Sequence, residues 1–218
     1  MTQPWTTLER VETDAGVLEL RRRGADDVLL TVAGRVLMNS RANRSEIALA
    51  QLTCATLGRD AAVLVGGLGL GYTLRAALDL LSDDARVVLA EIDPTIVRWN
   101  RTHLADLNRN VLDDPRLELR VEDVAATLGR GARFDAILFD LYEGPSSTPT
   151  PADDRLYGSA MLRRVRGALR PGGVFAVWAE QRCPPFEARL RRAGYRVELA
   201  GAERGSRRHA VYLAHPER

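Results

Sequence analysis

The amino-acid sequence predicts an α/β protein with an open, doubly wound, mostly parallel sheet of seven strands, preceded by a small β meander. Short apolar runs alternate with segments of helical periodicity through most of the chain, a pattern typical of parallel sheets with right-handed crossovers. The last two apolar runs are separated only by a polar loop, which predicts an antiparallel hairpin at one edge. We expect the meander in residues 1–40 and the sheet with its helices in residues 41–218.

Composition narrows the class of protein. The 218 residues are 45% hydrophobic and 28% charged, enough for one sizeable core with a small appendage. All 31 basic residues are arginine, but acids are interleaved with them and the net charge is only +2, so a nucleic-acid partner is not indicated. Two distant cysteines, histidines outside metal-ligand spacing and the absence of a membrane-length apolar stretch predict a cytoplasmic protein without a metal ion or a membrane partner.

The N-terminal part of the chain contains the meander and one helix. Polar and apolar residues alternate in short runs, which predict strands at Val17–Arg22, Val28–Val32 and Val36–Met38. Apolar residues follow a helical pattern from Asn43 to Leu57, with Asn43 or Ser45 as candidate N-caps. So small a meander buries little by itself, and we expect it to pack against the main domain beside a ligand cleft.

A strand, a glycine-rich turn and a helix follow, and they organise the rest of the chain. The strand is Ala61–Val65, the helix is Tyr72–Leu81, and a second strand at Arg86–Ala90 ends in Glu91. The glycines of the turn are Gly66, Gly67, Gly69 and Gly71. Glycine permits unusual backbone angles and close approach of a ligand, and the helix start offers free N–H groups. With Glu91 in reach of ribose hydroxyls, the segment predicts a nucleoside site; the alternative is an ordinary tight turn.

The remaining elements continue the alternation. Pro94 suits the first turn of a helix over Thr95–Leu104, and a polar loop at Glu143–Asp154 has the length of a lid or binding loop. The predicted strands are Leu117–Val121, Phe134–Phe139, Val174–Trp178, Tyr195–Leu199 and His209–Leu213, and the predicted helices are Leu156–Leu169 and Glu187–Arg192.

Acidic residues follow three of the predicted parallel strands. Glu91 ends the second strand, Asp123 comes after the third beside Glu122, and Asp140 ends the fourth. Ligands of such sheets bind outside the carboxyl ends of the strands, so these side chains predict one shared site. The alternative is that they are helix N-caps, and for Asp93 before Pro94 the cap is the favoured interpretation.

These motifs resemble a known family. Between Ala61 and Pro171 the order GGLGLG, EIDP, ED, FDLYEGP and LRPGG is similar to the class I S-adenosylmethionine-dependent transferases, most closely their spermidine synthase-like branch. The segment GRVLMNSRANRSEIALA, which leads out of the meander, also resembles that branch. The resemblance covers most of the chain and implies a Rossmann-like fold of the class I methyltransferase type.

The resemblance also implies roles for single residues. The four glycines would line the turn that binds S-adenosylmethionine or its decarboxylated form, Glu91 and Ile92 would lie at the ribose, and Glu122 and Asp123 at the adenine. Asp140, assisted by Tyr142 or Glu143, would bind the reacting amine and accept its proton.

Two departures from the family pattern bear on the substrate. Aminopropyltransferases carry an aspartate inside the turn, as in GGGDGG, whereas this turn has Leu68 and Leu70 and no acid. The tyrosine and histidine before the glutamate of the N-terminal segment are replaced by Arg44 and Ser45 before Glu46. A turn without an acid repels the carboxylate of S-adenosylmethionine less, which favours that donor slightly.

The sequence therefore predicts an alkyl transferase. It would move a methyl or aminopropyl group to an amine-bearing small molecule, and we expect a homodimer. A non-catalytic nucleoside-binding homologue or scaffold is the alternative. A third hypothesis, NAD-dependent oxidoreduction, explains the glycines and Glu91 but leaves Asp123 and Asp140 unexplained.

Overall fold

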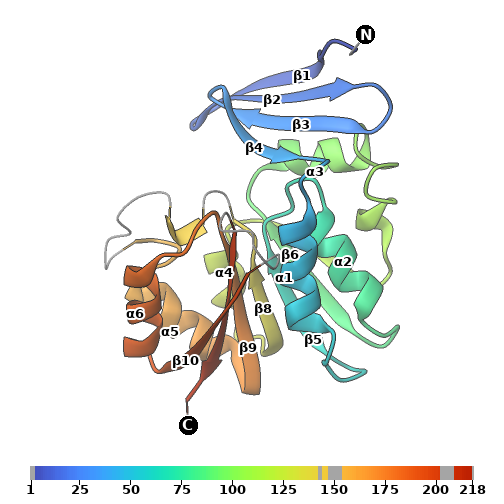
Figure 1. Ribbon diagram of the computed structural model, residues 1–218. Coiled ribbons are helices and arrows are strands. Elements are labelled where there is room, and N and C mark those ends of the chain that lie inside the picture. The colour runs from blue at the N-terminus through green and yellow to red at the C-terminus, as the bar shows by residue number, and fades with distance from the viewer. Residues whose placement is uncertain (1–2, 142–143, 147–153, 202–208, 218) are drawn as a thin grey trace.

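The computed structural model describes residues 3–141, 144–146, 154–201 and 209–217. They form a four-stranded antiparallel sheet and a seven-stranded sheet with helices on both faces (Figure 1). The seven-stranded sheet has the strand order β10-β11-β9-β8-β5-β6-β7. Strands β5 to β9 pair in parallel, while β11 runs antiparallel to both β9 and β10. The predicted fold class, including the edge hairpin, is confirmed.

The small N-terminal sheet has one strand more than the sequence predicts. Its strands are β1 (Thr6–Thr13), β2 (Gly16–Arg23), β3 (Asp27–Val32) and β4 (Arg35–Asn39). Strand β1 reads TTLERVET, in which only Leu8 and Val11 are large and apolar, so alternation alone does not reveal it. These two side chains pack against the core.

The large sheet and its helices carry the core. The strands are β5 (Ala62–Gly66), β6 (Arg86–Glu91), β7 (Leu117–Val121), β8 (Phe134–Phe139), β9 (Leu169–Ala179), β10 (Tyr195–Gly201) and β11 (Ala210–Pro216). The helices are α1 (Arg44–Cys54), α2 (Tyr72–Leu80), α3 (Pro94–Arg101), α4 (Val124–Leu128), α5 (Ser159–Ala168) and α6 (Pro184–Arg192), with short 3-10 turns η1 (Val111–Asp113) and η2 (Gly144–Ser146). Helices α1 to α3 cover one face and α4 to α6 the other, as a doubly wound sheet requires.

Several predicted boundaries differ from the structure by a few residues, namely the ends of α1 and α3 and the starts of α5, α6 and β9. Helix α5 begins at Ser159 rather than at Leu156, because the N–H groups of Leu156 and Tyr157 both donate to Oδ1 of Asp154 and hold a turn there. Strand β9 begins at Leu169, so the RPGG segment is part of the strand and not a separate loop. The pairing of β9 with β8 shifts register in this part.

The N-terminal sheet packs on α3 and beside the glycine-rich turn (Figure 1). The carboxylate of Glu9 in β1 accepts hydrogen bonds from the two terminal guanidinium nitrogens of Arg98 and from Nε1 of Trp99, at 2.5–2.8 Å. At the far edge of the sheet, the sulfur of Met38 in β4 accepts from the N–H of Leu70 at 3.4 Å. The meander thus contacts the region where the carboxyl ends of the parallel strands meet.

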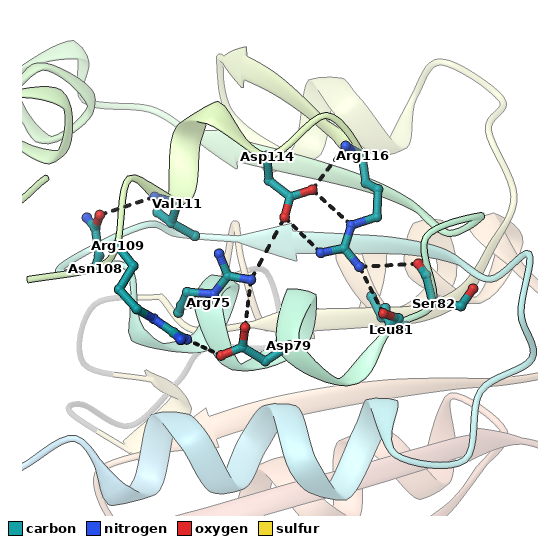
Figure 2. Close-up of polar contacts among 9 residues, drawn as sticks. All are labelled: Arg75, Asp79, Leu81, Ser82, Asn108, Arg109, Val111, Asp114 and Arg116. Carbon is teal, nitrogen blue, oxygen red and sulfur yellow. Dashed lines mark hydrogen bonds and ion pairs between the residues drawn. The ribbon is translucent and has the colours of Figure 1, made fainter. Parts of the chain in front are cut away.

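A charged network fixes the helix that follows the glycine-rich turn (Figure 2). Arg75 of α2 lies 2.7 Å from Asp79 and 3.8 Å from Asp114. Asp114 accepts two hydrogen bonds from the guanidinium of Arg116, at 2.7 and 2.9 Å, and Arg116 in turn donates to the carbonyl oxygen of Leu81 at 2.8 Å. The network therefore ties α2 to the segment that leads into β7.

Candidate active site

Two glycines of the turn occupy positions where a side chain does not fit. Gly67 has a φ of +90°, and a Cβ there would lie 2.2 Å from the carbonyl oxygen of Asp140. Gly69 has a φ of +50°, and its Cβ would lie 2.2 Å from the sulfur of Met38. Gly67 therefore lets β5 and β8 approach each other, and the turn exposes main chain at two positions where a side chain would not fit.

The other two glycines differ from each other. Gly71 has a φ of +86° and stands as the N-cap of α2, so the first amides of that helix begin at the turn. Gly66 has no positive φ, and a Cβ there would meet only side-chain atoms of Val124 and Phe139, at 3.1 and 3.3 Å. The alternative of an ordinary tight turn therefore describes Gly66 better than it describes the other three glycines.

Glu91 joins the turn to the end of β6. Its Oε2 accepts a hydrogen bond from the N–H of Leu68 at 2.8 Å, and its Oε1 accepts from the N–H of Asp93 at the same distance. The side chain is only 7% exposed. Burial raises the pKa of Glu91, while these backbone hydrogen bonds lower it. Each oxygen retains lone pairs, so the carboxylate can brace the turn and still accept from a hydroxyl group.

Two apolar side chains lie open at the same sheet edge. Ile92 follows β6 and is 59% exposed, and Val121 ends the neighbouring strand β7 and is 50% exposed. Glu91 and Val121 are register partners, so the open side chains flank the carboxylate. This arrangement of glycine backbone, carboxylate and open apolar surface fits the adenosyl part of a sulfonium donor.

The acids after β7 have partners of their own. Oδ1 of Asp123 accepts from the N–H of Ala125 at 2.9 Å and so caps α4, and Oδ2 pairs with Arg155. Glu122 accepts from Thr127 at 2.8 Å and from Arg130 at 2.5 Å, which together lower its pKa to about 2. The cap alternative therefore holds for Asp123 in this conformation, and the adenine role of these two acids stays a prediction.

Asp140 lies at the end of β8 next to the turn. Its N–H donates to the carbonyl oxygen of Gly66 at 2.9 Å, and its Oδ2 accepts from the hydroxyl of Thr73 at 2.6 Å. Burial, followed by the charge of Glu46, raises the pKa of Asp140 to about 7, against the Thr73 hydrogen bond, which lowers it. A carboxyl group with such a pKa accepts a proton readily near neutral pH. Its two predicted helpers, Tyr142 and Glu143, lie outside the described residues.

The structure adds residues that the sequence analysis did not place in the site. Thr73 stands in the first turn of α2, and Glu46 stands in the first turn of α1, where it is 6% exposed and accepts from the hydroxyl of Ser45 at 2.5 Å. The ring of His209 stacks on that of Trp178 with centroids 5.4 Å apart, and its cationic form lowers the pKa of Glu46. For Thr73, its position directly after the glycine turn is a sequence feature that predicts a place in the site. For His209, no sequence feature predicts a place in the site.

A hollow elsewhere on the surface has the wrong charge for this chemistry. It measures about 630 Å³ between α5 and α6 and is lined by four arginines, Arg163, Arg166, Arg189 and Arg192. A sulfonium and an ammonium ion would both be repelled there. No group of metal-ligating side chains occurs within the described ranges, and none of the helices found there is long and apolar enough to span a membrane.

Comparison with known proteins identifies the family. The model of the spermine/spermidine synthase domain matches residues 45–190, which is about two thirds of the chain. The chain belongs to this family. The matched residues of the spermine/spermidine synthase domain begin in α1 and include the turn, Glu91 and Asp140, so the family resemblance predicted from the sequence is confirmed.

The family relatives are longer proteins. A polyamine aminopropyltransferase of Aeropyrum pernix is 36% identical over 126 residues, which are 56% of this chain and 38% of the relative. One from Mycobacterium tuberculosis is 36% identical over 128 residues, 56% of this chain and 23% of the relative. The chain thus matches less than half the length of these relatives.

Solved structures support the fold. A crystal structure of spermidine synthase from Thermotoga maritima matches with a TM-score of 0.74 at 21% identity, over 97% of this chain and 73% of the other. A spermidine synthase in complex with the transition state analogue AdoDATO matches with a TM-score of 0.73 at 20% identity, over 97% and 72% of the two chains. At these identities the likeness concerns the fold alone.

Proposed function

We propose that this protein transfers an alkyl group from an adenosyl sulfonium donor to the nitrogen of a small amine. We propose further that the donor is decarboxylated S-adenosylmethionine, so that the group is aminopropyl. The observation that carries the proposal is the partly buried carboxyl of Asp140 beside the glycine-rich turn, with Thr73 donating to it at 2.6 Å. Membership of the spermine/spermidine synthase family and the names of its relatives support the choice of donor.

The residues of the chain have separate tasks in this reaction. The turn at Gly67 and Gly69 and the carboxylate of Glu91 would hold the nucleoside, with Ile92 against its apolar face. The sulfonium supplies an activated carbon and a good leaving group. Positioning and electrostatic stabilisation then provide most of the acceleration.

Asp140 has the part of base and amine ligand. An ammonium ion must lose its proton before the nitrogen can attack carbon, and a carboxylate within hydrogen-bond reach can accept it. A pKa raised to about 7 matches that task, because a more acidic carboxyl group would be a weaker base. The negative charge of Asp140 would also attract both cationic substrates.

Methyl transfer from S-adenosylmethionine is the second candidate. It is favoured by the turn itself, in which Leu68 and Leu70 are 4% and 0% exposed and no acid is present to select the amine of a decarboxylated donor. The cytoplasmic setting and the homodimer stay predictions from the sequence.

Product analysis tests the proposal. Purified protein is incubated with each donor and a panel of primary amines, and products are identified by mass spectrometry. We expect aminopropylated amine from the decarboxylated donor, about a hundredfold less or lower still with Asp140→Asn, and a normal amount with Asp106→Asn, which replaces an exposed carboxylate. Methylated amine would support the second candidate, and the absence of any product with either donor would favour the non-catalytic alternative.

A further inference from the structure

Two acidic residues from distant parts of the sequence meet at Thr73. Glu46 belongs to the first turn of α1, and Asp140 follows β8. The hydroxyl of Thr73 connects them, because it donates to Oδ2 of Asp140 at 2.6 Å and lies 3.3 Å from the main-chain carbonyl oxygen of Glu46. Helix α1 packs on β8, β9 and β11, which brings Glu46 to the carboxyl edge of the sheet.

Among the described residues, no arginine acts on the charge of either carboxyl group. Glu46 receives one hydroxyl from Ser45, and Asp140 receives one from Thr73. Burial raises the pKa of each group, and the charge of Glu46 raises that of Asp140 further. Two like charges in a poorly solvated site cannot both form cheaply, so such a pair retains a proton and titrates in two steps.

Three buried polar atoms lack a hydrogen-bond partner among the described residues: Oη of Tyr157, Nε1 of Trp178 and Nδ1 of His209. The charge of Asp140 acts on Tyr157, that of His209 acts on Glu46, and Trp178 stacks on His209. Tyr157 is 4% exposed; burial raises its pKa, followed by the nearby charge of Asp140. Buried polar groups in native proteins are nearly always paired, so unpaired ones beside two carboxyl groups indicate a place for a polar ligand.

We propose that Glu46 and Asp140 act as one carboxyl pair that binds the ammonium group of the acceptor, with Glu46 as a second amine ligand. The proposal rests on the proposed function, which supplies the amine. In the free protein the two groups hold one proton between them. A primary ammonium ion replaces that proton, which leaves for solvent, and the pair then faces the cation as two carboxylates.

The titratable groups that the structure describes near the pair act in opposing directions. Glu46 on α1 raises the pKa of Asp140, and Thr73 on α2 lowers it. Cationic His209, at the start of β11, lowers the pKa of Glu46. Tyr157, ahead of α5, and Tyr72 on α2 have pKa values raised mainly by burial, and both remain neutral below pH 9 or so. The expected effects of substitution follow from these signs.

Carboxyl-carbon NMR of the protein without ligands tests the pair. The Asp140 signal is assigned by its loss in Asp140→Asn and followed against pH. We expect an upper step near pH 7 in the wild type. In Glu46→Gln that step should be replaced by a single transition lower by about one unit or more, because a like charge is removed. Thr73→Val should move the Asp140 midpoint upward, since a hydrogen bond to the charged form is lost.

Glu118→Gln is the matched control, because Glu118 is a 61% exposed carboxylate on β7. It should leave the Asp140 midpoint unchanged. An identical Asp140 midpoint in Glu46→Gln and Glu118→Gln would overturn the pair. Far-UV circular dichroism checks that each variant folds. If Glu46→Gln does not fold, Thr73→Val still tests the environment of Asp140 through its shift in the opposite direction.

Calorimetry with n-butylamine as the probe tests the ligand. Titrations near neutral pH in two buffers of different ionisation enthalpy report the protons released on binding. We expect net proton release in the wild type, and in Glu46→Gln about tenfold weaker binding without that release. Equal affinity in both proteins, no release in the wild type, or no binding at all would refute Glu46 as an amine ligand. Neither experiment contains a sulfonium donor, so failure here is distinguishable from failure of the proposed function.

Discussion

Oε2 of Glu91 accepts a hydrogen bond from the N–H of Leu68 at 2.8 Å, so the residue predicted to bind ribose also holds the glycine-rich turn in place. Strand β6 ends at this carboxylate, and the turn leaves β5 beside it. Binding of the donor and the shape of its cradle therefore depend on the same side chain.

Replacing Glu91 by glutamine should weaken both functions. The amide can accept through only one of its two terminal atoms, so one of the N–H groups of Leu68 and Asp93 loses its partner. We expect donor affinity to fall about tenfold and the free energy of unfolding to fall by about 1–3 kcal/mol. Calorimetry and urea denaturation measure the two effects, with Glu118→Gln as the exposed control. Unchanged affinity would show that Glu91 does not contact the donor.

Gly67 should be far less replaceable than a glycine outside the turn. Alanine at Gly67 would place Cβ 2.2 Å from a backbone oxygen at a φ of +90°, so we expect a loss of about 3 kcal/mol or more in unfolding free energy. Gly167 in α5 has no atom within 4 Å of the corresponding Cβ position, and Gly167→Ala should stabilise the protein by about 0.5–1 kcal/mol. Thermal or urea unfolding compares the two variants. Equal effects would mean that the turn is not tightly packed against Asp140.

The raised pKa of Asp140 has consequences for stability and for rate. A carboxyl group with a pKa of about 7 in the folded protein and about 4 in the unfolded chain binds more protons when folded. The unfolding free energy therefore falls as the pH rises between those values. Asp140→Asn removes this partly buried charge, so the variant should be more stable than the wild type at about pH 8, with a smaller difference at about pH 5.

The transfer rate should respond to the same group in the opposite direction. The wild-type rate should rise with pH up to about 7, as Asp140 loses its proton, and Asp140→Asn should lower it about a hundredfold or more. Steady-state rates against pH measure this, and Asp106→Asn should retain the wild-type profile. A flat profile in the wild type would rule out Asp140 as the base.

The network in Figure 2 should contribute more to stability than an exposed ion pair. Asp114 and Arg116 have side chains 11% and 13% exposed, and Arg116 holds the pKa of Asp114 below its usual range. Asp114→Asn should lower the unfolding free energy by about 2 kcal/mol at neutral pH, and this difference should shrink in acid as Asp114 is protonated. In the control Asp84→Asn, the partner Arg59 is 86% exposed, and the loss should stay below about 1 kcal/mol. Denaturant unfolding at two pH values distinguishes them.

Much of the fold follows from local patterns. The seven strands of the large sheet are apolar runs between turns, and Asp93 caps α3 by accepting from the N–H of Thr95, as its place before Pro94 predicts. The sequence pattern does not reveal strand β1, because an edge strand with few apolar residues shows no strong alternation, and its pairing with β2 depends on register.

The candidate site was predictable only where it lies next to a strand end. Glu91 and Asp140 follow strands directly, whereas Glu46 reaches the same edge through the packing of α1 across β8, β9 and β11. Asp123 is the opposite case. Its place after β7 predicts a ligand contact, but in the structure its carboxylate caps α4 and pairs with Arg155. Such tertiary partners leave no periodic signal in a single sequence.

Isothermal titration calorimetry with decarboxylated S-adenosylmethionine, S-adenosylmethionine and methylthioadenosine, on the wild type and Glu91→Gln, tests the central proposal most directly. We expect one donor-binding site per chain in the wild type, tightest for the decarboxylated donor and about tenfold weaker in Glu91→Gln. No binding of any of the three compounds to the wild type would contradict the assignment of this sheet edge as a sulfonium-donor site.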